Sequence, residues 1–332
     1  MPWRNTTHPY HIWLSEIILQ QTRVAQGLPY YIAFTEAFPT VQDLAQATEE
    51  EVLKLWQGLG YYSRGRNLHA SAKMIVEEMD GVFPNTYEEI KKLKGVGDYT
   101  ASAIASICFN EPTAVVDGNV YRVLSRVYGI DTPINSTAGV KEFKALAQEL
   151  IDEDRPADFN QAIMEFGAIQ CKPQNPYCLH CIYNDSCVAL QQNKVSVLPV
   201  KLKKTKVTHK YFHYLYIKDK QEQTIIKQRT GKGIWQGLYE FPVIEELAAL
   251  QEGEEDRFRE SVKNHSLLQG LVINDIDRYN DTPIVHKLSH QHLHTTFWIV
   301  TVDEITDNAT PINRITELPV PVLIGNFIEK LL

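Results

Sequence analysis

Four cysteines in one short stretch constrain the fold of this chain more than any other feature of its sequence. Cys171, Cys178, Cys181 and Cys187 form the pattern C-x6-C-x2-C-x5-C, directly after a segment with helical periodicity. Thiolates so close in sequence converge on one point and suit a metal centre. Structural zinc ordinarily uses two separated short knuckles, and only Cys178 and Cys181 form one. The wider gaps therefore favour an iron–sulfur cluster, with zinc or unliganded thiols as the alternatives.

Size and composition predict two domains. The chain has 332 residues, more than one ordinary domain, and its 44% of hydrophobic residues is enough for packed cores. No apolar run approaches the roughly 18 residues of a membrane span. The sequence also lacks the basic and then apolar residues that are typical of a signal peptide at its start. We therefore expect a soluble, cytoplasmic protein without disulfides. The net charge of −8 argues against coating nucleic acid through bulk charge, but it permits binding through a few placed groups.

The sequence changes character near residue 190. Helix-sized segments separated by Gly, Pro and Asn occupy 9–23, 40–56, 67–79, 86–93, 99–109, 120–127, 139–151 and 159–169. Segments in which apolar and polar residues alternate, as is typical of strands, follow at 211–217, 223–228, 286–290 and 294–302. Helices are expected between them at 243–250 and 255–268. The pattern predicts an all-α domain over residues 1–190, a basic linker over 191–210 and a smaller α+β domain over 211–332.

The expected linker carries five lysines and no acid between residues 201 and 210. These lysines are Lys201, Lys203, Lys204, Lys206 and Lys210. A basic segment of this kind between two folded parts is typical of a solvated linker. The alternative is a strap that contacts phosphate groups.

Two further features lie in the helical part. Gly95, Val96 and Gly97 form a Gly-x-Gly turn between two helix-like segments, where backbone N–H groups at a helix N-terminus can face an anion. No strand precedes this turn, which excludes a dinucleotide-binding fingerprint. Asp117 ends an apolar segment and begins a helix. Taken singly, the two features are also typical of a plain helix–helix connection and of an N-cap residue.

Together, the glycine turn, Asp117 and the cysteine loop resemble the helix–hairpin–helix DNA glycosylase superfamily. Segments 13–22, 58–64, 117–120 and 159–162 are more narrowly similar to the adenine DNA glycosylases, the MutY family. The resemblance spans nearly the whole chain and is strongest over residues 1–190. It implies a helix–hairpin–helix at about 86–109, a [4Fe-4S] cluster loop at 171–187 and a Nudix-like domain at 211–332 that recognises 8-oxoguanine.

The resemblance assigns catalysis to two carboxyl groups. Glu16 lies inside an apolar helical segment, where burial would raise its pKa; on a polar helix face it would be an ordinary acid. The family implies that Glu16 protonates the adenine ring and later helps to activate water, while ionised Asp117 stabilises the sugar cation. Tyr99 stands where related lyases carry a lysine that forms a Schiff base. We therefore expect a monofunctional glycosylase, with Tyr99 and Asn119 supporting the transition state.

The resemblance also implies how DNA is held, because the reacting base must leave the stack. Gln21 and Tyr61 would wedge into the duplex, although Tyr61 beside Tyr62 also suits an aromatic core. The other implied contacts are Thr22, Leu59, Ser289 and His290 with the base opposite adenine, Arg4 and Gln161 with the extruded adenine, and Gly95, Val96 and Gly97 with a phosphate.

The function that follows is base excision repair. We expect a monomeric, nucleoid-associated enzyme that removes adenine mispaired with 8-oxoguanine or guanine from double-stranded DNA. Segment 233–242 resembles a Nudix motif, but the glutamates after it lack the spacing of a Nudix metal box, so pyrophosphatase activity is not expected. Two alternatives are an endonuclease III-like glycosylase with AP lyase activity and a non-catalytic lesion-binding protein.

Overall fold

The computed structural model describes residues 1–202, 207–250 and 253–332. The chain forms two compact units, residues 1–47 with 63–204 and residues 48–62 with 205–332. Segment 48–62 therefore packs with the second unit, although its sequence lies within the expected domain 1–190. Lys203, Lys204 and Lys206 of the expected linker lie outside the described residues. Within the described ranges, no helix is long and apolar enough to cross a membrane.

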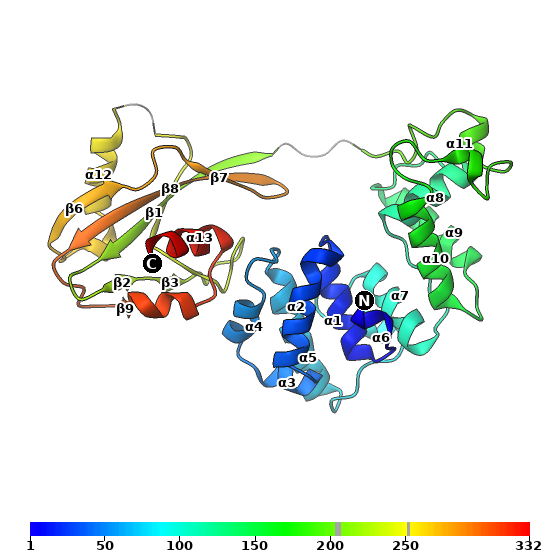
Figure 1. Ribbon diagram of the computed structural model, residues 1–332, viewed down its shortest axis with the longest axis horizontal. Helices are drawn as coiled ribbons and strands as arrows, with labels where there is room; N and C mark the ends of the chain where they lie inside the picture. The colour runs from blue at the N-terminus through cyan, green and yellow to red at the C-terminus, as the bar shows by residue number, and fades with distance from the viewer. Residues whose placement is uncertain (203–206, 251–252) are drawn as a thin grey trace. The chain divides into compact units, whose positions relative to one another are not determined.

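The first unit is helical, as predicted, and none of its described residues forms a strand (Figure 1). Its helices are α1 (Pro9–Leu19), α2 (Val24–Ala37), α3 (Val41–Gln46), α5 (Ser63–Glu78), α6 (Tyr87–Ile90), α7 (Asp98–Phe109), α8 (Gly118–Tyr128), α9 (Thr137–Leu150), α10 (Pro156–Ile169) and α11 (Val188–Gln191), with 3-10 turns η1 (Pro2–Arg4) and η2 (Cys178–His180). Helix α10 leads into the loop that carries the four cysteines, and α11 follows that loop.

The helix expected over residues 40–56 is in fact two helices, α3 and α4 (Glu49–Leu55). Each begins with a capping box. The Thr40 side chain accepts from the Asp43 amide while Asp43 accepts from the Thr40 amide, and Thr48 and Glu51 repeat the arrangement. A second cap satisfies the first amides of a new helix, so it starts α4 instead of continuing α3. The prediction of one continuous helix was wrong because Thr48 and Glu51 form a second helix start.

Helix α2 has no counterpart among the expected helices, because Gly27 and Pro29 inside it both disfavour helix interiors. It forms nevertheless because it packs on α1. At Gly27 the approach is so close that a Cβ would lie 2.9 Å from the Leu19 side chain and 3.2 Å from that of Ile18. Tertiary contact therefore decides this helix, at a position where glycine is the residue that fits.

Two buried layers meet at α7. Helix α1 is apolar on most sides, and its Trp13, Leu14 and Ile18 are fully buried. It packs against α2, α5 and α7. A second cluster, which includes Val120 and Phe143, joins α7 to α8, α9 and α10. Since α7 belongs to both layers, side chains of α1 and of the start of α8 can meet beside it.

Within its described residues, the second unit contains one mixed seven-stranded sheet and belongs to the predicted α+β class. Its central strands, β1 (Thr208–Lys218) and β8 (Gln291–Val302), run parallel along all of β1 and along β8 as far as Thr301. The other strands of the sheet are β2 (Gln223–Ile225), β5 (Val243–Glu246), β6 (Ile273–Arg278), β7 (Ile284–Lys287) and β9 (Ala309–Pro311); β3 (Lys227–Gln228) pairs separately with β4 (Tyr239–Glu240). The helices are α4, α12 (Glu255–Lys263) and α13 (Val322–Leu331), with 3-10 turns η3 (Ser266–Leu268) and η4 (Ile312–Glu317).

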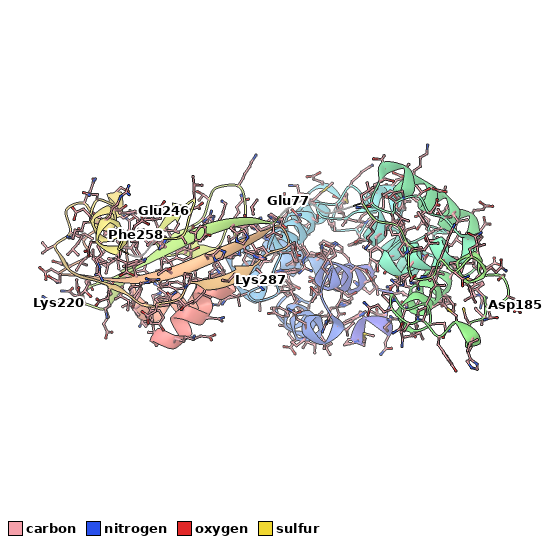
Figure 2. The ribbon with its side chains drawn as sticks, turned by 90° about the horizontal axis from the view of Figure 1, so that it is seen from above. Glu77, Asp185, Lys220, Glu246, Phe258 and Lys287 are labelled. Atoms are coloured by element: carbon pink, nitrogen blue, oxygen red, sulfur yellow. The ribbon has the colours of Figure 1, made fainter. Side chains whose placement is uncertain are left out.

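Helices cover both faces of this sheet. Phe297 and Trp298 are neighbours on β8, so their side chains point to opposite faces. Phe327 of α13 stacks on Phe297 with ring centroids 4.0 Å apart, and Phe258 of α12 packs against Trp298 at 4.9 Å. Figure 2 shows α12, which carries the labelled Phe258, and α13 on opposite sides of the long strands.

The helix expected at residues 243–250 is absent, and β5 occupies its first half. Val243 and Ile244 pair antiparallel with Tyr214 and His213 of β1. The Glu, Ala and Leu residues of this segment favour a helix locally. Pairing with a long central strand satisfies the backbone of Val243–Glu246 and overrides that preference.

Candidate active site

Glu16 lies in the middle of α1, on the turn that faces α7. Its side chain is only partly exposed, and its neighbours Ser15 and Ile17 are buried. Burial raises the pKa of Glu16 from its usual value of 4.5 to about 7, against the opposing influence of a hydrogen bond with Tyr99 and the charge of Arg4. A carboxyl group with this pKa is a general acid suited to neutral pH.

Tyr99 of α7 lies against Glu16, because α1 packs on α7. Burial raises the pKa of the Tyr99 hydroxyl, and the charges of Glu16 and Asp117 raise it further. The phenol therefore stays protonated and donates a hydrogen bond to Glu16. Its oxygen also lies 3.6 Å from the sulfur of Met164 on α10. Three residues that are distant in sequence, Glu16, Tyr99 and Asp117, are thus brought into one electrostatic group.

Cys108 of α7 is a half-buried neighbour of this group. Burial raises the pKa of its thiol to about 12, and the charge of Glu16 adds to the increase. The thiol is therefore neutral at physiological pH. No local signal predicted this proximity, since residues nine apart on an α-helix lie on opposite faces.

Replacement of Glu16 by glutamine should stabilise the protein at alkaline pH. Because the pKa of Glu16 is raised from 4.5 to about 7, the folded protein binds the proton more tightly than the unfolded chain, and stability is lost as pH rises through this window. Glutamine has no charge to bury. We expect Glu16→Gln to gain about 3 kcal/mol in urea unfolding near pH 8 and almost nothing near pH 4. An equal effect near pH 4 and near pH 8 would contradict the raised pKa.

Asp117 is the N-cap of α8, and three N–H groups hold its carboxylate. Oδ1 accepts from the backbone amides of Asn119 and Val120, each at 2.8 Å, and Oδ2 accepts from Asn119 Nδ2 at 2.8 Å. These contacts fix the orientation of the carboxylate beside Tyr99. The capping interpretation of Asp117 and the electrostatic one are therefore both compatible with its geometry.

Arg122 and Asn160 support this region and were missed by sequence reasoning. Buried Arg122 donates to Asn119 Oδ1 at 2.9 Å and to the carbonyl oxygen of Cys171 at 2.7 Å. Buried Asn160 accepts from the Val115 amide at 3.0 Å, which ties α10 to the segment before Asp117. A run of hydrogen bonds thus connects Asp117 through Asn119 and Arg122 to the backbone of the cysteine loop.

Cys171, Cys178, Cys181 and Cys187 line one cavity of the first unit, together with Arg126 and Phe166. Burial raises the pKa of the Cys178 thiol, and the proximity of the other three cysteines adds to it. Arg126 Nη1 lies 3.5 Å from Cys171 Sγ and donates to the Lys172 carbonyl at 2.7 Å. Within the described residues, no three His, Cys, Asp or Glu side chains stand close enough to hold a single metal ion. The four thiols thus line one cavity without forming a ready-made site for a single ion.

The glycine turn joins α6 to α7. Gly95 has φ +77°, and a Cβ there would lie 2.9 Å from Cβ of Asn67, so this position requires glycine. Gly97 is the N-cap of α7 and is exposed, with open space where a Cβ would point. The amide of buried Val96 donates to the Leu93 carbonyl at 3.2 Å, and this hydrogen bond is part of the turn itself. The amides that can face an anion are therefore those of the exposed glycines.

The predicted adenine contacts lie on separate elements of the first unit. Arg4 in η1 is exposed, and its charge acts on Glu16; Gln161 on α10 is half-buried.

Gln21, which is predicted to wedge into the duplex, has φ +54° in the turn after α1 and is exposed. Thr22 follows it, and buried Arg64 braces this turn by donating to the carbonyls of Ile17, Ile18 and Gln20 at 2.7 to 3.0 Å.

The remaining predicted contacts lie in the second unit. Tyr61 is 48% exposed with φ +48°, and its hydroxyl lies 2.5 Å from Ser289 Oγ. His290 is exposed between β7 and β8 and accepts from the Thr208 amide through its carbonyl. Leu59 is 5% exposed, so its side chain belongs to the core of the structure as it stands. Tyr61 and Ser289, distant in sequence, are brought into contact.

Both units match known families. Residues 14–153 match the HhH-GPD superfamily of base excision DNA repair proteins, and residues 213–330 match the NUDIX domain. Among solved structures, a thermostable thymine-DNA glycosylase superposes with a TM-score of 0.54 at 30% identity, covering 58% of this chain and 88% of the other. Endonuclease III in a trapped covalent complex with DNA shares the fold, with a TM-score of 0.50 at 24% identity over 56% of this chain and 85% of the other.

Similar sequences come from animals and bacteria. The adenine DNA glycosylase of Mus musculus is 48% identical over 211 residues, covering 60% of this chain and 41% of the mouse protein. This chain thus matches less than half the length of that relative. The adenine DNA glycosylase of Buchnera aphidicola subsp. Baizongia pistaciae is 34% identical over 305 residues, which cover 90% of this chain and 81% of the relative. Because that alignment includes both units and most of both chains, this chain belongs to the adenine DNA glycosylase family.

Proposed function

We propose that this protein hydrolyses the N-glycosidic bond of adenine mispaired with 8-oxoguanine or guanine in double-stranded DNA. The observation that carries the proposal is the group formed by Glu16, Tyr99 and Asp117, in which one carboxyl group has a pKa of about 7. Two carboxyl groups in different environments can serve as acid and as charge stabiliser for an oxocarbenium-like transition state. We infer that the enzyme acts as a monomer, associated with the nucleoid.

In the proposed mechanism, Glu16 donates its proton to the adenine ring, which weakens the bond to the sugar. The Tyr99 hydroxyl, which hydrogen-bonds to Glu16, keeps that carboxyl group oriented. Asp117 stabilises the cationic sugar, and Glu16, now ionised, accepts a proton from the attacking water. Asn119 holds Asp117 through its side-chain amide at 2.8 Å. Since the phenol of Tyr99 cannot form a Schiff base, no strand cleavage accompanies base removal.

The DNA contacts are proposed on the same basis. Extrusion of adenine leaves a gap that exposed Gln21 and Tyr61 would fill. Arg4 and Gln161 would hold the extruded base. A phosphate would bind at the exposed glycine amides of the turn before α7, where the helix dipole favours an anion.

We also propose that Cys171, Cys178, Cys181 and Cys187 hold a [4Fe-4S] cluster. All four line one cavity, and a four-iron cluster separates its ligands more widely than a single zinc ion does. When bound, the cluster would crosslink the loop through iron–thiolate bonds. The loop backbone at Cys171 would then support Arg122, which donates to it and to Asn119.

Metal analysis tests this assignment. The protein purified without oxygen should contain about four iron atoms and four inorganic sulfides per chain. Cys181→Ser should lose most of both, because it removes one of the thiols that line the cavity. Cys108→Ser is the matched control and should keep them, since Cys108 lies beside Glu16 and outside that cavity. One zinc per chain in place of iron would refute the cluster.

One assay tests the function. The protein is incubated with a duplex containing adenine opposite 8-oxoguanine, and free adenine and strand breaks are measured before and after alkali. We expect adenine release, with breaks that appear only after alkali. Breaks without alkali would support the endonuclease III-like lyase instead, and binding without release would support a lesion-binding protein.

A further inference from the structure

Helix α4 is fastened to the segment that precedes α13. Lys54 Nζ donates to the carbonyl oxygen of Thr316 at 2.6 Å and to that of Leu318 at 3.1 Å. It also lies 3.4 Å from Gln57 Oε1, which accepts from the Val320 amide at 3.3 Å. One ammonium group therefore joins α4 to two carbonyl groups that are more than 260 positions away in sequence.

The environment of Lys54 makes this contact more than a surface interaction. Its side chain is half-buried, and burial lowers the pKa of Lys54 while the charge of Glu317 partly offsets that effect. Hydrogen bonds from a charged donor are stronger than those between neutral groups. Helix α4 makes a second hydrogen bond of this kind, in which the Tyr239 hydroxyl donates to the carboxylate of Glu50 at 3.2 Å.

The turn after α4 is tied to the same segment. The Tyr62 hydroxyl accepts from the Gly58 amide at 3.2 Å and donates to the Val320 carbonyl at 3.4 Å. Trp56 Nε1 donates to the Gly60 carbonyl at 3.0 Å, which closes the turn on itself. At the tip of this closed turn stands Tyr61, with its hydroxyl 2.5 Å from Ser289.

We propose that Lys54 is a positioning residue for recognition of the base opposite adenine. By holding α4 against the carbonyls of Thr316 and Leu318, it fixes the position of the closed turn. The Tyr61 hydroxyl then lies within hydrogen-bonding distance of Ser289. The two side chains then meet DNA as one preorganised surface. Lys54 acts through Tyr61, and the proposal rests on the function proposed above.

The test compares Lys54→Met with Lys54→Arg, which retains a cationic donor, and with Lys330→Met, which removes an exposed lysine of α13. Adenine release is followed in single turnovers at several protein concentrations, on duplexes with 8-oxoguanine or guanine opposite adenine. For Lys54→Met we expect the preference for 8-oxoguanine over guanine to fall about tenfold. The main change should be in the protein concentration that gives half the maximal rate, and the rate at saturating protein should change little. Lys54→Arg should recover most of it, and Lys330→Met should match the parent protein.

Amide hydrogen exchange gives a readout that needs no activity. Residues 56–62 should exchange faster in Lys54→Met than in the parent protein and Lys54→Arg. An unchanged preference in Lys54→Met would overturn the proposal, and so would an equal loss on both duplexes accompanied by a lower melting temperature, which indicates a structural role only. If the parent protein releases no adenine from either duplex, the proposed function itself fails, which is a different result from parent activity with an unaffected variant.

Discussion

Replacement of Glu16 by glutamine should reduce the rate of adenine release about 10³-fold, within the range for loss of a general acid. Glutamine preserves the size of the side chain and can still accept from Tyr99, so the change removes the transferable proton and little else. The parent protein should lose activity as pH rises above about 7, because Glu16 then gives up the proton it must donate. Single-turnover rates between about pH 5 and pH 9 measure both effects.

Glu77→Gln is the matched control for this substitution. Glu77 is an exposed acid of α5 and is labelled in Figure 2. This variant should retain the rate and the pH profile of the parent protein. A Glu16→Gln protein that still released adenine at a comparable rate would remove Glu16 from the mechanism, and a rate that rose with pH would reverse its role from acid to base.

Replacement of Asp117 by asparagine should also lower the rate of adenine release about 10³-fold, since the transition state would lose a preorganised negative charge. The stability of the protein should change by less than about 1 kcal/mol, because asparagine caps a helix nearly as well as aspartate. The variant thus separates the two interpretations of this residue. If Asp117 were only the N-cap of α8, Asp117→Asn would leave catalysis intact.

A second N-cap provides the comparison. The Ser136 side chain caps α9 by accepting from the Gly139 amide at 3.0 Å. Ser136→Asn exchanges one good capping residue for another, and we expect both stability and activity to be retained. Activity lost equally in Ser136→Asn and Asp117→Asn would indicate that disturbance of a helix start, rather than a missing charge, is the cause.

Much of the fold could be predicted from local signals. Periodicity located most of the helices of the first unit, and alternation located the two central strands of the sheet. The errors have specific physical causes. Helix α2 forms around Gly27 and Pro29 because it packs on α1, and β5 forms at Val243 and Ile244 because it pairs with β1. Contacts between elements outweigh local propensities, which cost about 1 kcal/mol at a helical glycine and about 3 kcal/mol at a helical proline.

The sequence by itself determined the four-cysteine pattern, the glycine turn and the residues Glu16, Tyr99 and Asp117, because these are choices of residue type at fixed spacing. Only the tertiary structure decided what they become. Packing of α1 on α7 desolvates Glu16, sets its pKa near 7 and places Tyr99 against it. The same folding brought Tyr61 to Ser289. Burial and hydrogen bonding depend on which elements meet, and that is a property of the folded chain rather than of any local segment.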